Sequence, residues 1–136
     1  SDQIISITDI FATCAEITGV LLPDDAGEDS VSFLNCLLGK QVGPFREACV
    51  QQSGKKALAI RKGKWKLIVH GDNKRELFDL NTDIGESNNL IQEHPKVSSE
   101  LATLLQTYLD NGRSTPGKAQ PIKYNITLDE IRYSRE

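Results

Sequence analysis

The stretch LFDLNTDIGESNNL, from Leu77 to Leu90, gathers carboxylate and amide side chains of the kind that bind calcium. Two Asp, one Glu and three Asn lie within these fourteen residues. An EF-hand loop needs oxygen ligands at positions one, three and five, Gly at position six and a bidentate Glu at position twelve. Counted from Asp79, the first three ligands fit, but Ile84 stands where Gly is needed and Leu90 where Glu is needed. The spacing therefore argues against an EF-hand.

The two histidines are the candidate general bases. His70 ends a predicted strand where a turn begins, so we expect it to face solvent. His94 precedes Pro95, and we predict that it caps the following helix. A Ser-His-Asp triad needs a histidine oriented by a carboxylate, and we assign neither of these two histidines as a general base. The sequence also contains no Gly-x-x-x-x-Gly-Lys phosphate loop.

The three cysteines, Cys14, Cys36 and Cys49, do not have the spacing of a zinc site. They lie 22 and 13 residues apart and include no Cys-x-x-Cys pair. An odd number also excludes a fully paired set of disulfides. Because free cysteine usually packs as a small hydrophobic side chain, we expect buried free thiols.

Composition indicates an ordinary, slightly acidic domain. The 136 residues are 38% hydrophobic and 26% charged, which suits one domain with a hydrophobic core. The formal net charge is −3, the isoelectric point is about 5.4, and basic residues form only small clusters, so we expect no nucleic-acid partner. No apolar run approaches the length of a membrane span. Ser1-Asp2-Gln3 lacks the basic and apolar regions of a signal peptide.

Apolar spacing predicts two helices in the first third of the chain. The apolar face of the first is formed by Ile7, Ile10, Phe11, Cys14 and Ile17. Ser6 is its expected N-cap, with Asp9 three residues later, and Gly19 is its expected end. A short second helix is predicted over residues 31–38, ended by Gly39.

Four strands are predicted next, over residues 46–53, 57–61, 64–70 and 76–80. Lys62-Gly63 should form the tight turn between the middle pair, which makes an antiparallel sheet the expected arrangement. Trp65, Leu67 and Val69 fall on one face, and Lys64, Lys66 and His70 on the other. One side of the sheet should therefore be buried and the other wet.

The last helix has the clearest pattern. Pro95 occupies its first position and Asn111-Gly112 its end. Its apolar positions are Val97, Leu101, Leu104, Leu105, Tyr108 and Leu109. This apolar face should lie across the dry side of the sheet. Residues 113–136 show little periodicity, and we predict a mostly extended tail.

Several segments, taken in order, resemble the C-terminal third of a type I sulfatase. They are ISITDIFATCAEITGVLLP, DSVSFLNCLLGK, ALAIRKGKWKLI, ELFDLNTDIGESNNL and HPKV with its helix and GRSTPG, over residues 1 to about 117. The most specific match is the 77–90 segment, which fits the family's pattern of Leu, aromatic, Asp, Leu, two residues, Asp, Pro, one residue, Glu, two residues, Asn, Leu, except that Ile84 replaces Pro. Ala12 also stands where the family usually has Pro, and Ser30 where Gly is usual.

The resemblance implies an α+β fold: a small antiparallel sheet of about four strands packed by a C-terminal amphipathic helix, preceded by helices that finish a larger α/β domain. Residues 1–45 would end the large domain, 46–112 would form the sheet-and-helix subdomain, and 113–136 the tail. The 77–90 segment would be a structural turn. In it, Asp83, Glu86 and Asn89 would cap backbone amides, and Leu80 and Leu90 would anchor its ends in the core.

The resemblance does not supply catalytic residues. Type I sulfatases make formylglycine from Cys or Ser in a Cys/Ser-x-Pro-x-Arg motif and use a calcium ion, and none of the three cysteines is followed by that motif. Asp24-Asp25-Ala26-Gly27 resembles the family's metal-binding Asp-Asp-x-Gly, but it follows a helix instead of a buried strand. We therefore assign no catalytic, cofactor-binding or metal residue. Calcium and formylglycine are implied for the parent sulfatase only.

The resulting expectation is a C-terminal subdomain fragment of a sulfatase that is inactive alone. Its partner would be the catalytic domain of the parent chain, and the exposed first helix could also form homo-oligomers through Ile7, Phe11 and Cys14. A periplasmic or secreted location is suggested only by the family. The alternatives are a stand-alone binding or regulatory module and a fragment of a related phosphoesterase of the alkaline phosphatase superfamily.

Overall fold

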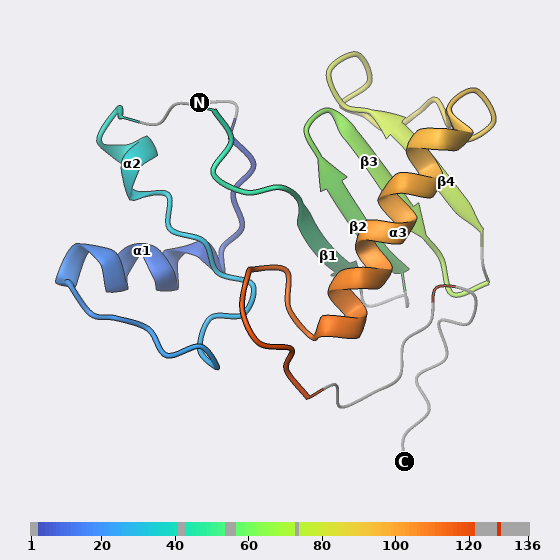
Figure 1. Cartoon of the computed structure of the whole chain (residues 1–136). Helices are drawn as coiled ribbons and strands as arrows, with labels where there is room; N and C mark the ends of the chain where they lie inside the picture. Colours follow the sequence, from blue (N-terminus) through green and yellow to red (C-terminus); the bar gives the residue numbers. More distant parts are fainter. Residues whose placement is uncertain (1–2, 41–42, 54–56, 73, 122–127, 129–136) are drawn as a thin grey trace.

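The structure is a computed structural model that describes residues 3–40, 43–53, 57–72, 74–121 and 128. Two helices precede a sheet, and a long helix follows it (Figure 1). The elements are α1 (Asp9–Thr18), α2 (Leu34–Leu37), β1 (Cys49–Ser53), β2 (Ala57–Lys62), β3 (Trp65–Val69), β4 (Arg75–Asp79) and α3 (Pro95–Asn111). None of the helices in the described part of the chain is long and apolar enough to cross a membrane.

The four strands form one antiparallel sheet in the order β1-β2-β3-β4. This arrangement, with α3 after it, confirms the predicted α+β fold class. The predicted turn was wrong by one residue, because Lys62 pairs with Trp65 and the two-residue loop is Gly63-Lys64. Gly63 has φ +56°, a conformation that costs glycine little and other residues more.

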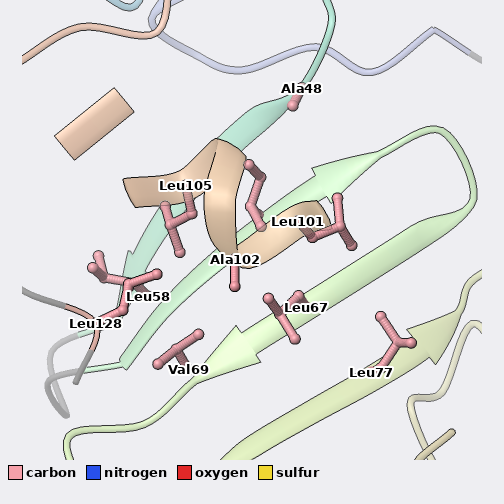
Figure 2. Packing of buried hydrophobic residues seen from close by; sticks show 10 residues of the cluster. Ala48, Leu58, Leu67, Val69, Leu77, Leu101, Ala102, Leu105 and Leu128 are labelled. Atoms are coloured by element: carbon pink, nitrogen blue, oxygen red, sulfur yellow. The ribbon is translucent and has the colours of Figure 1, made fainter. Parts of the chain in front are cut away.

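The core lies between the sheet and α3, as the apolar pattern predicts. Figure 2 shows α3 crossing over the strands, and Leu101 and Leu105 belong to the same buried cluster as Leu67 and Val69. Leu67, Leu77 and Leu105 have no measurable exposure, and full burial of such a side chain contributes roughly 1.5–3 kcal/mol. Leu128 is buried in the same cluster.

The second face of the sheet is less wet than the alternation predicts. Phe78 and Cys49 on this face are 5% and 3% exposed, so both faces of β4 contribute buried side chains. Lys66 and His70 on the same face are half-buried; Lys66 is ion-paired with Glu86, and His70 is hydrogen-bonded to Glu76. Cross-strand charges and neighbouring loops therefore cover part of a face that alternation alone marks as solvent-facing.

The helices before the sheet differ in detail from the prediction. α1 begins at Asp9 after an N-cap at Thr8, and Ser6 makes no side-chain cap. Instead the Ser6 amide donates to Asp9 Oδ2 at 2.7 Å, which is half of a capping box. Gly19 ends the helix in the left-handed conformation, as predicted. The second helix is only one turn long.

The described start of the tail is bent, not extended. Its residues fold back on the loop after α1: the Ser114 amide donates to Asp29 Oδ1 at 2.9 Å, and the Thr115 hydroxyl donates to the Glu28 carbonyl at 2.6 Å. Nothing in local periodicity predicts these contacts, because their partners lie more than eighty residues earlier. Most of the remaining tail, residues 122–127 and 129–136, lies outside the described residues.

Candidate functional site

The 77–90 segment uses its polar side chains to hold its own backbone. Asp83 accepts hydrogen bonds from the amides of Ser87 and Asn88 at 2.9 and 2.8 Å. These hydrogen bonds lower the pKa of the Asp83 carboxyl, and the bond from the Asn88 amide has the largest effect. Asn89 Oδ1 likewise accepts from the amides of Leu77 and Ile91. The predicted capping by Asp83 and Asn89 is therefore present.

Glu86 does not cap an amide, contrary to the prediction. Its carboxylate pairs with Lys66 at 2.5 Å, which joins the turn to the strand beneath it. Glu86 also has φ +55°, which is uncommon for a residue other than glycine. Leu80 and Leu90 are half-buried and not core anchors. The Leu90 amide instead ties the segment to β4 by donating to the Leu77 carbonyl at 2.8 Å.

Asp79 would be the first ligand of an EF-hand loop, but its carboxylate is bound by protein groups. Lys64 Nζ lies 2.6 Å from its Oδ2, and the Asn81 amide donates to its Oδ1 at 3.1 Å. The hydrogen bond from Lys64 is the main reason that the pKa of Asp79 lies below its ordinary value. The carboxylate therefore remains ionised and neutralised by lysine. The 77–90 segment is a structural turn in which Asp79 and Asp83 accept hydrogen bonds from protein donors.

The histidines do not form a catalytic pair. His70 Nε2 lies 2.7 Å from Glu76 Oε2, so this ring is hydrogen-bonded at the sheet surface instead of facing solvent freely. His94 occupies the N-cap position of α3, but its side chain makes no cap hydrogen bond. Its ring packs on Trp65 with centroids 4.8 Å apart. The predicted capping role of the His94 side chain was therefore wrong.

The cysteines are free thiols, but only one of them is buried. Cys49 is buried on β1, Cys36 is half-buried and Cys14 is exposed on α1. Cys14 was expected to be buried because it belongs to the apolar pattern of that helix. The pattern is correct, but the face that carries it is exposed among the described residues.

Asp24, in the Asp-Asp-x-Gly look-alike, also has a structural role. Its carboxylate accepts from Arg113 Nη1 at 3.2 Å and from the Lys118 amide at 3.0 Å. Among the described residues, no group of three or more His, Cys, Asp or Glu side chains is arranged to hold a metal. The Asp24 carboxylate, bound to Arg113 and Lys118, does not fit the calcium site that the resemblance implies for a whole sulfatase.

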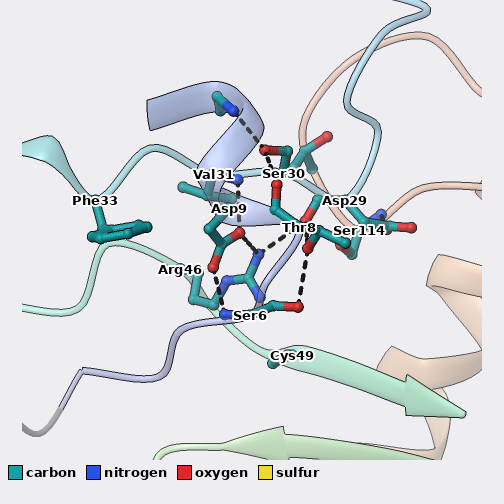
Figure 3. Close-up of polar contacts among 12 residues, drawn as sticks. Ser6, Thr8, Asp9, Asp29, Ser30, Val31, Phe33, Arg46, Cys49 and Ser114 are labelled. Carbon is teal, nitrogen blue, oxygen red and sulfur yellow. Dashed lines mark hydrogen bonds and ion pairs between the residues drawn. The ribbon is translucent and has the colours of Figure 1, made fainter. Parts of the chain in front are cut away.

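A buried ion pair joins α1 to the start of β1, and sequence reasoning missed it. Arg46 Nη2 lies 2.8 Å from Asp9 Oδ1, with side-chain exposures of 5% and 0% (Figure 3). The same guanidinium donates to the Asp29 carbonyl at 3.0 Å, and the Val31 amide donates to Asp9. The only signal in the sequence was an Asp among apolar helical positions. Its partner lies 37 residues away and could not be inferred.

Two departures from the family pattern contact each other beside this ion pair. The Ala12 amide, which a proline would lack, donates to Ser30 Oγ at 2.9 Å. The Ser30 hydroxyl, which a glycine would lack, donates to the Thr8 carbonyl at 2.7 Å. Ser30 thus joins the Ala12 amide to the Thr8 carbonyl at the start of α1. The two departures form one hydrogen-bonded unit.

The outward face of α1 is the candidate functional surface. Asp9, Thr13 and Ala15 face inward and are buried. The outward face of α1 and the segments just before and after the helix carry large hydrophobic side chains that are at least half exposed, namely Ile7, Ile10, Phe11, Ile17, Val20 and Leu21. Leu21 is 95% exposed and Ile7 84%. A contiguous apolar surface of this kind marks an interaction site more often than a free surface.

Comparison with known proteins identifies relatives over most of the chain. An N-acetylgalactosamine-6-O-sulfatase of Bacteroides thetaiotaomicron is 40% identical over 114 residues, covering 73% of this chain and 22% of that protein. Arylsulfatase K of Mus musculus is 26% identical over 122 residues, covering 79% of this chain and 22% of that protein. This chain matches the C-terminal part of sulfatases. The predicted resemblance is confirmed, although no protein-family model matches the chain.

Solved sulfatase structures agree with this assignment. A sulfatase from a study of glycosaminoglycan metabolism by B. thetaiotaomicron gives a TM-score of 0.66 at 39% identity, covering 73% of this chain and 24% of that one. The phosphonate monoester hydrolase of Agrobacterium radiobacter gives 0.54 at 21% identity, which shows a shared fold alone. The chain thus spans less than a quarter of the length of the curated sulfatases that it matches.

Proposed function

We propose that this chain is the C-terminal subdomain of a sulfatase and acts as a scaffold for a catalytic part that it does not contain. The observation that carries the proposal is the two-sided helix α1. Its inner side is fixed by Asp9 and Thr13, whereas its outer side presents Ile10 and Ile17 to solvent. A helix fixed in place with its apolar face open is built to pack against another surface.

The occupant of that surface would be the catalytic part of the sulfatase. The relatives extend well beyond the matched region, since that region is 22% of their length. The formylglycine and the calcium ion implied by the family would belong to that part, with attack on the sulfur of a sulfate ester. By analogy with the N-acetylgalactosamine-6-O-sulfatase, the substrates would be 6-O-sulfated amino sugars or related sulfated sugars.

Tyr108 does not supply a base or a nucleophile to the chain alone. Burial, with the Glu47 carboxylate beside it, raises the pKa of Tyr108 to about 12. Its hydroxyl is therefore protonated at neutral pH and donates to Glu47 Oε2 at 3.3 Å. The described histidines contact Glu76 and Trp65, and Asp79 and Asp83 bond to protein donors.

A chimaera tests the proposal directly. The C-terminal 22% of the B. thetaiotaomicron relative is replaced by this chain, and hydrolysis of an aryl sulfate is measured with calcium present. We expect activity from the chimaera, none from the relative truncated at the same point, and none from this chain alone. An Ile7→Glu/Ile17→Glu chimaera should lose activity, because charges on the open face oppose packing. Ile84→Glu, at an 88% exposed loop position, is the matched control.

Two results would contradict the proposal. Sulfate release by the purified chain alone would show that it contains its own catalytic residues. A well-folded but inactive chimaera would favour the stand-alone binding module.

Without its partner, the chain should associate with itself through the same face. Ile7, Phe11 and Cys14 are all exposed and would meet across such an interface. We expect sedimentation at high protein concentration to show dimers or larger species, and Ile7→Glu/Ile17→Glu to shift them to monomer. A wild-type chain that stays monomeric would show that the apolar face alone does not drive association.

A further inference from the structure

The β2–β3 hairpin carries a cluster of cations around its turn that the scaffold role does not use. Residues 61–66 read RKGKWK, with four positive side chains in six positions. An open groove of about 720 Å³ lies at this turn, and its charged lining consists of Arg46, Glu47, Arg61, Lys62 and Lys64. Its volume lies within the range of small-ligand pockets, and its described lining has four cations and one carboxylate.

Two of these cations are committed to buried partners. Arg46 is paired with Asp9, and Lys64 with Asp79. Removing either from its partner would leave a charge largely out of water, which is costly. Neither is therefore free to bind a ligand, although Lys64 remains 45% exposed at the rim.

Arg61 and Lys62 are the cations available to a ligand. The contact described for the Arg61 side chain is a bond from Nε to the Gly63 carbonyl at 3.2 Å, and within the described part of the chain no carboxylate lies within ion-pair distance. Lys62 pairs with Glu47 at 2.7 Å, but both side chains are at least half exposed. Exposed pairs of this kind contribute about 0–1 kcal/mol to stability, so Lys62 can leave Glu47 and bind an anionic ligand with little loss of free energy.

Glu47 would keep a donor if Lys62 turned to a ligand. Tyr108 donates to its other carboxylate oxygen, so the acid would not be left without a partner. The Asn81 amide also lines the groove and can bond to hydroxyl or acetamido groups. Arg61 and Lys62 leave β2 on opposite faces, Arg61 opposite Lys66 and Lys62 opposite Trp65, and both line the groove at the hairpin end. At that end the site combines a planar guanidinium, an ammonium and a neutral amide.

We propose that this groove, centred on Arg61 and Lys62, binds a sulfate group of a glycan at a sugar other than the one being hydrolysed. A guanidinium presents paired donors that match the oxygens of a sulfate, and short Lys/Arg-rich runs are typical of sites for sulfated polysaccharides. The neutral lining fits the rest of a sugar. The choice of a sulfated glycan over another anion rests on the proposed function.

Binding to the full 136-residue chain tests this inference without catalysis. The probe is a hexasaccharide of alternating glucuronate and 6-O-sulfated N-acetylgalactosamine, titrated by calorimetry against the same hexasaccharide after desulfation and against sodium sulfate. We expect the sulfated form to bind most tightly and the affinity to fall as salt is raised. Arg61→Gln/Lys62→Gln should weaken binding about tenfold. Arg61→Lys should lose part of that affinity, because it keeps the charge but not the fork.

Lys74→Gln is the matched control, since Lys74 is an exposed cation beside the opposite end of β3. Equal binding of sulfated and desulfated sugar, equal binding of sodium sulfate, or unchanged affinity in folded Arg61→Gln/Lys62→Gln would each overturn the inference. The proposed function has its own readout. A chimaera with Arg61→Gln/Lys62→Gln should still hydrolyse an aryl sulfate, so loss of glycan binding and failure as a scaffold are distinguishable.

Discussion

The region around α1 and the sheet-and-α3 region distribute polar and apolar side chains in opposite ways. Around α1, an ion pair is buried and large hydrophobic side chains are exposed. Between the sheet and α3, leucine, isoleucine and valine are buried, and the charges lie at the surface or in turns. One region therefore completes its own core, whereas the other orders its inner side with polar contacts and leaves its apolar side open.

This contrast shows that an apolar stripe on a helix does not by itself ensure that the helix is buried in a core. The stripe on α1 obeys helical periodicity as well as the stripe on α3 does. Within the described residues, α3 is the helix that packs on the buried apolar face of the sheet. The orientation of α1 is held instead by Asp9, Arg46 and Ser30, so these polar residues determine which face of the helix remains open.

The largest expected effect comes from breaking the buried ion pair. Asp9→Ala leaves the Arg46 charge buried without its carboxylate, and we expect a loss of about 3–5 kcal/mol in the stability of the α1 region. Hydrogen exchange should show α1 amides losing protection while β2 and β3 amides keep theirs. Glu16→Gln, an exposed change on α1, is the control. Equal loss of protection in both regions would show that they fold as one unit.

Truncation of a leucine to alanine should lower the free energy of unfolding in the core between the sheet and α3 but not in the exposed loop after α1. Leu105→Ala removes a side chain with no measurable exposure and should cost about 2–5 kcal/mol in urea unfolding. Leu21→Ala, at a position 95% exposed, should change stability by less than about 0.5 kcal/mol. Similar costs at the two positions would mean that the loop after α1 is packed in solution.

The Ala12–Ser30 unit should show as coupling in a double-mutant cycle. Ser30→Gly should cost about 1 kcal/mol, because the Ala12 amide loses its acceptor. In an Ala12→Pro background that amide is absent, so the second change should cost less. Urea unfolding of the four proteins gives the coupling energy. Strictly additive costs would show that the two departures from the family pattern are independent.

The smallest expected effect is the acid sensitivity of the 77–90 turn. The pKa of Asp83 is lowered from 3.8 by amide hydrogen bonds, so its carboxylate stabilises the folded state above the unfolded pKa. That contribution is lost as pH falls below about 4 and through the lower folded pKa. Asp83→Asn should therefore flatten the dependence of stability on pH in this range. Glu93→Gln, at an exposed carboxylate in the same connection, should leave the slope steeper than Asp83→Asn does.

Local patterns predicted the strands and α3 well. Alternation and helical periodicity place β2, β3, β4 and α3 within a residue or two of their observed bounds, because neighbouring side chains decide which face is apolar. The polarity of the 77–90 segment predicted amide capping by Asp83 and Asn89 for the same reason, since their partners are local or on the adjoining strand. Glu86 was misassigned because its partner, Lys66, is on another strand.

The sequence by itself determined the alternation of apolar and polar positions, the left-handed ends of the helices at Gly19 and Gly112, and the match to sulfatases. Only the tertiary structure decided that Asp9 meets Arg46, that residues after Gly112 return to the loop at 24–29, and that Arg61 and Lys62 line one groove. The physical reason is range. Caps and periodicity depend on residues a few positions apart, whereas ion pairs, burial and grooves depend on groups that meet only after the chain has folded.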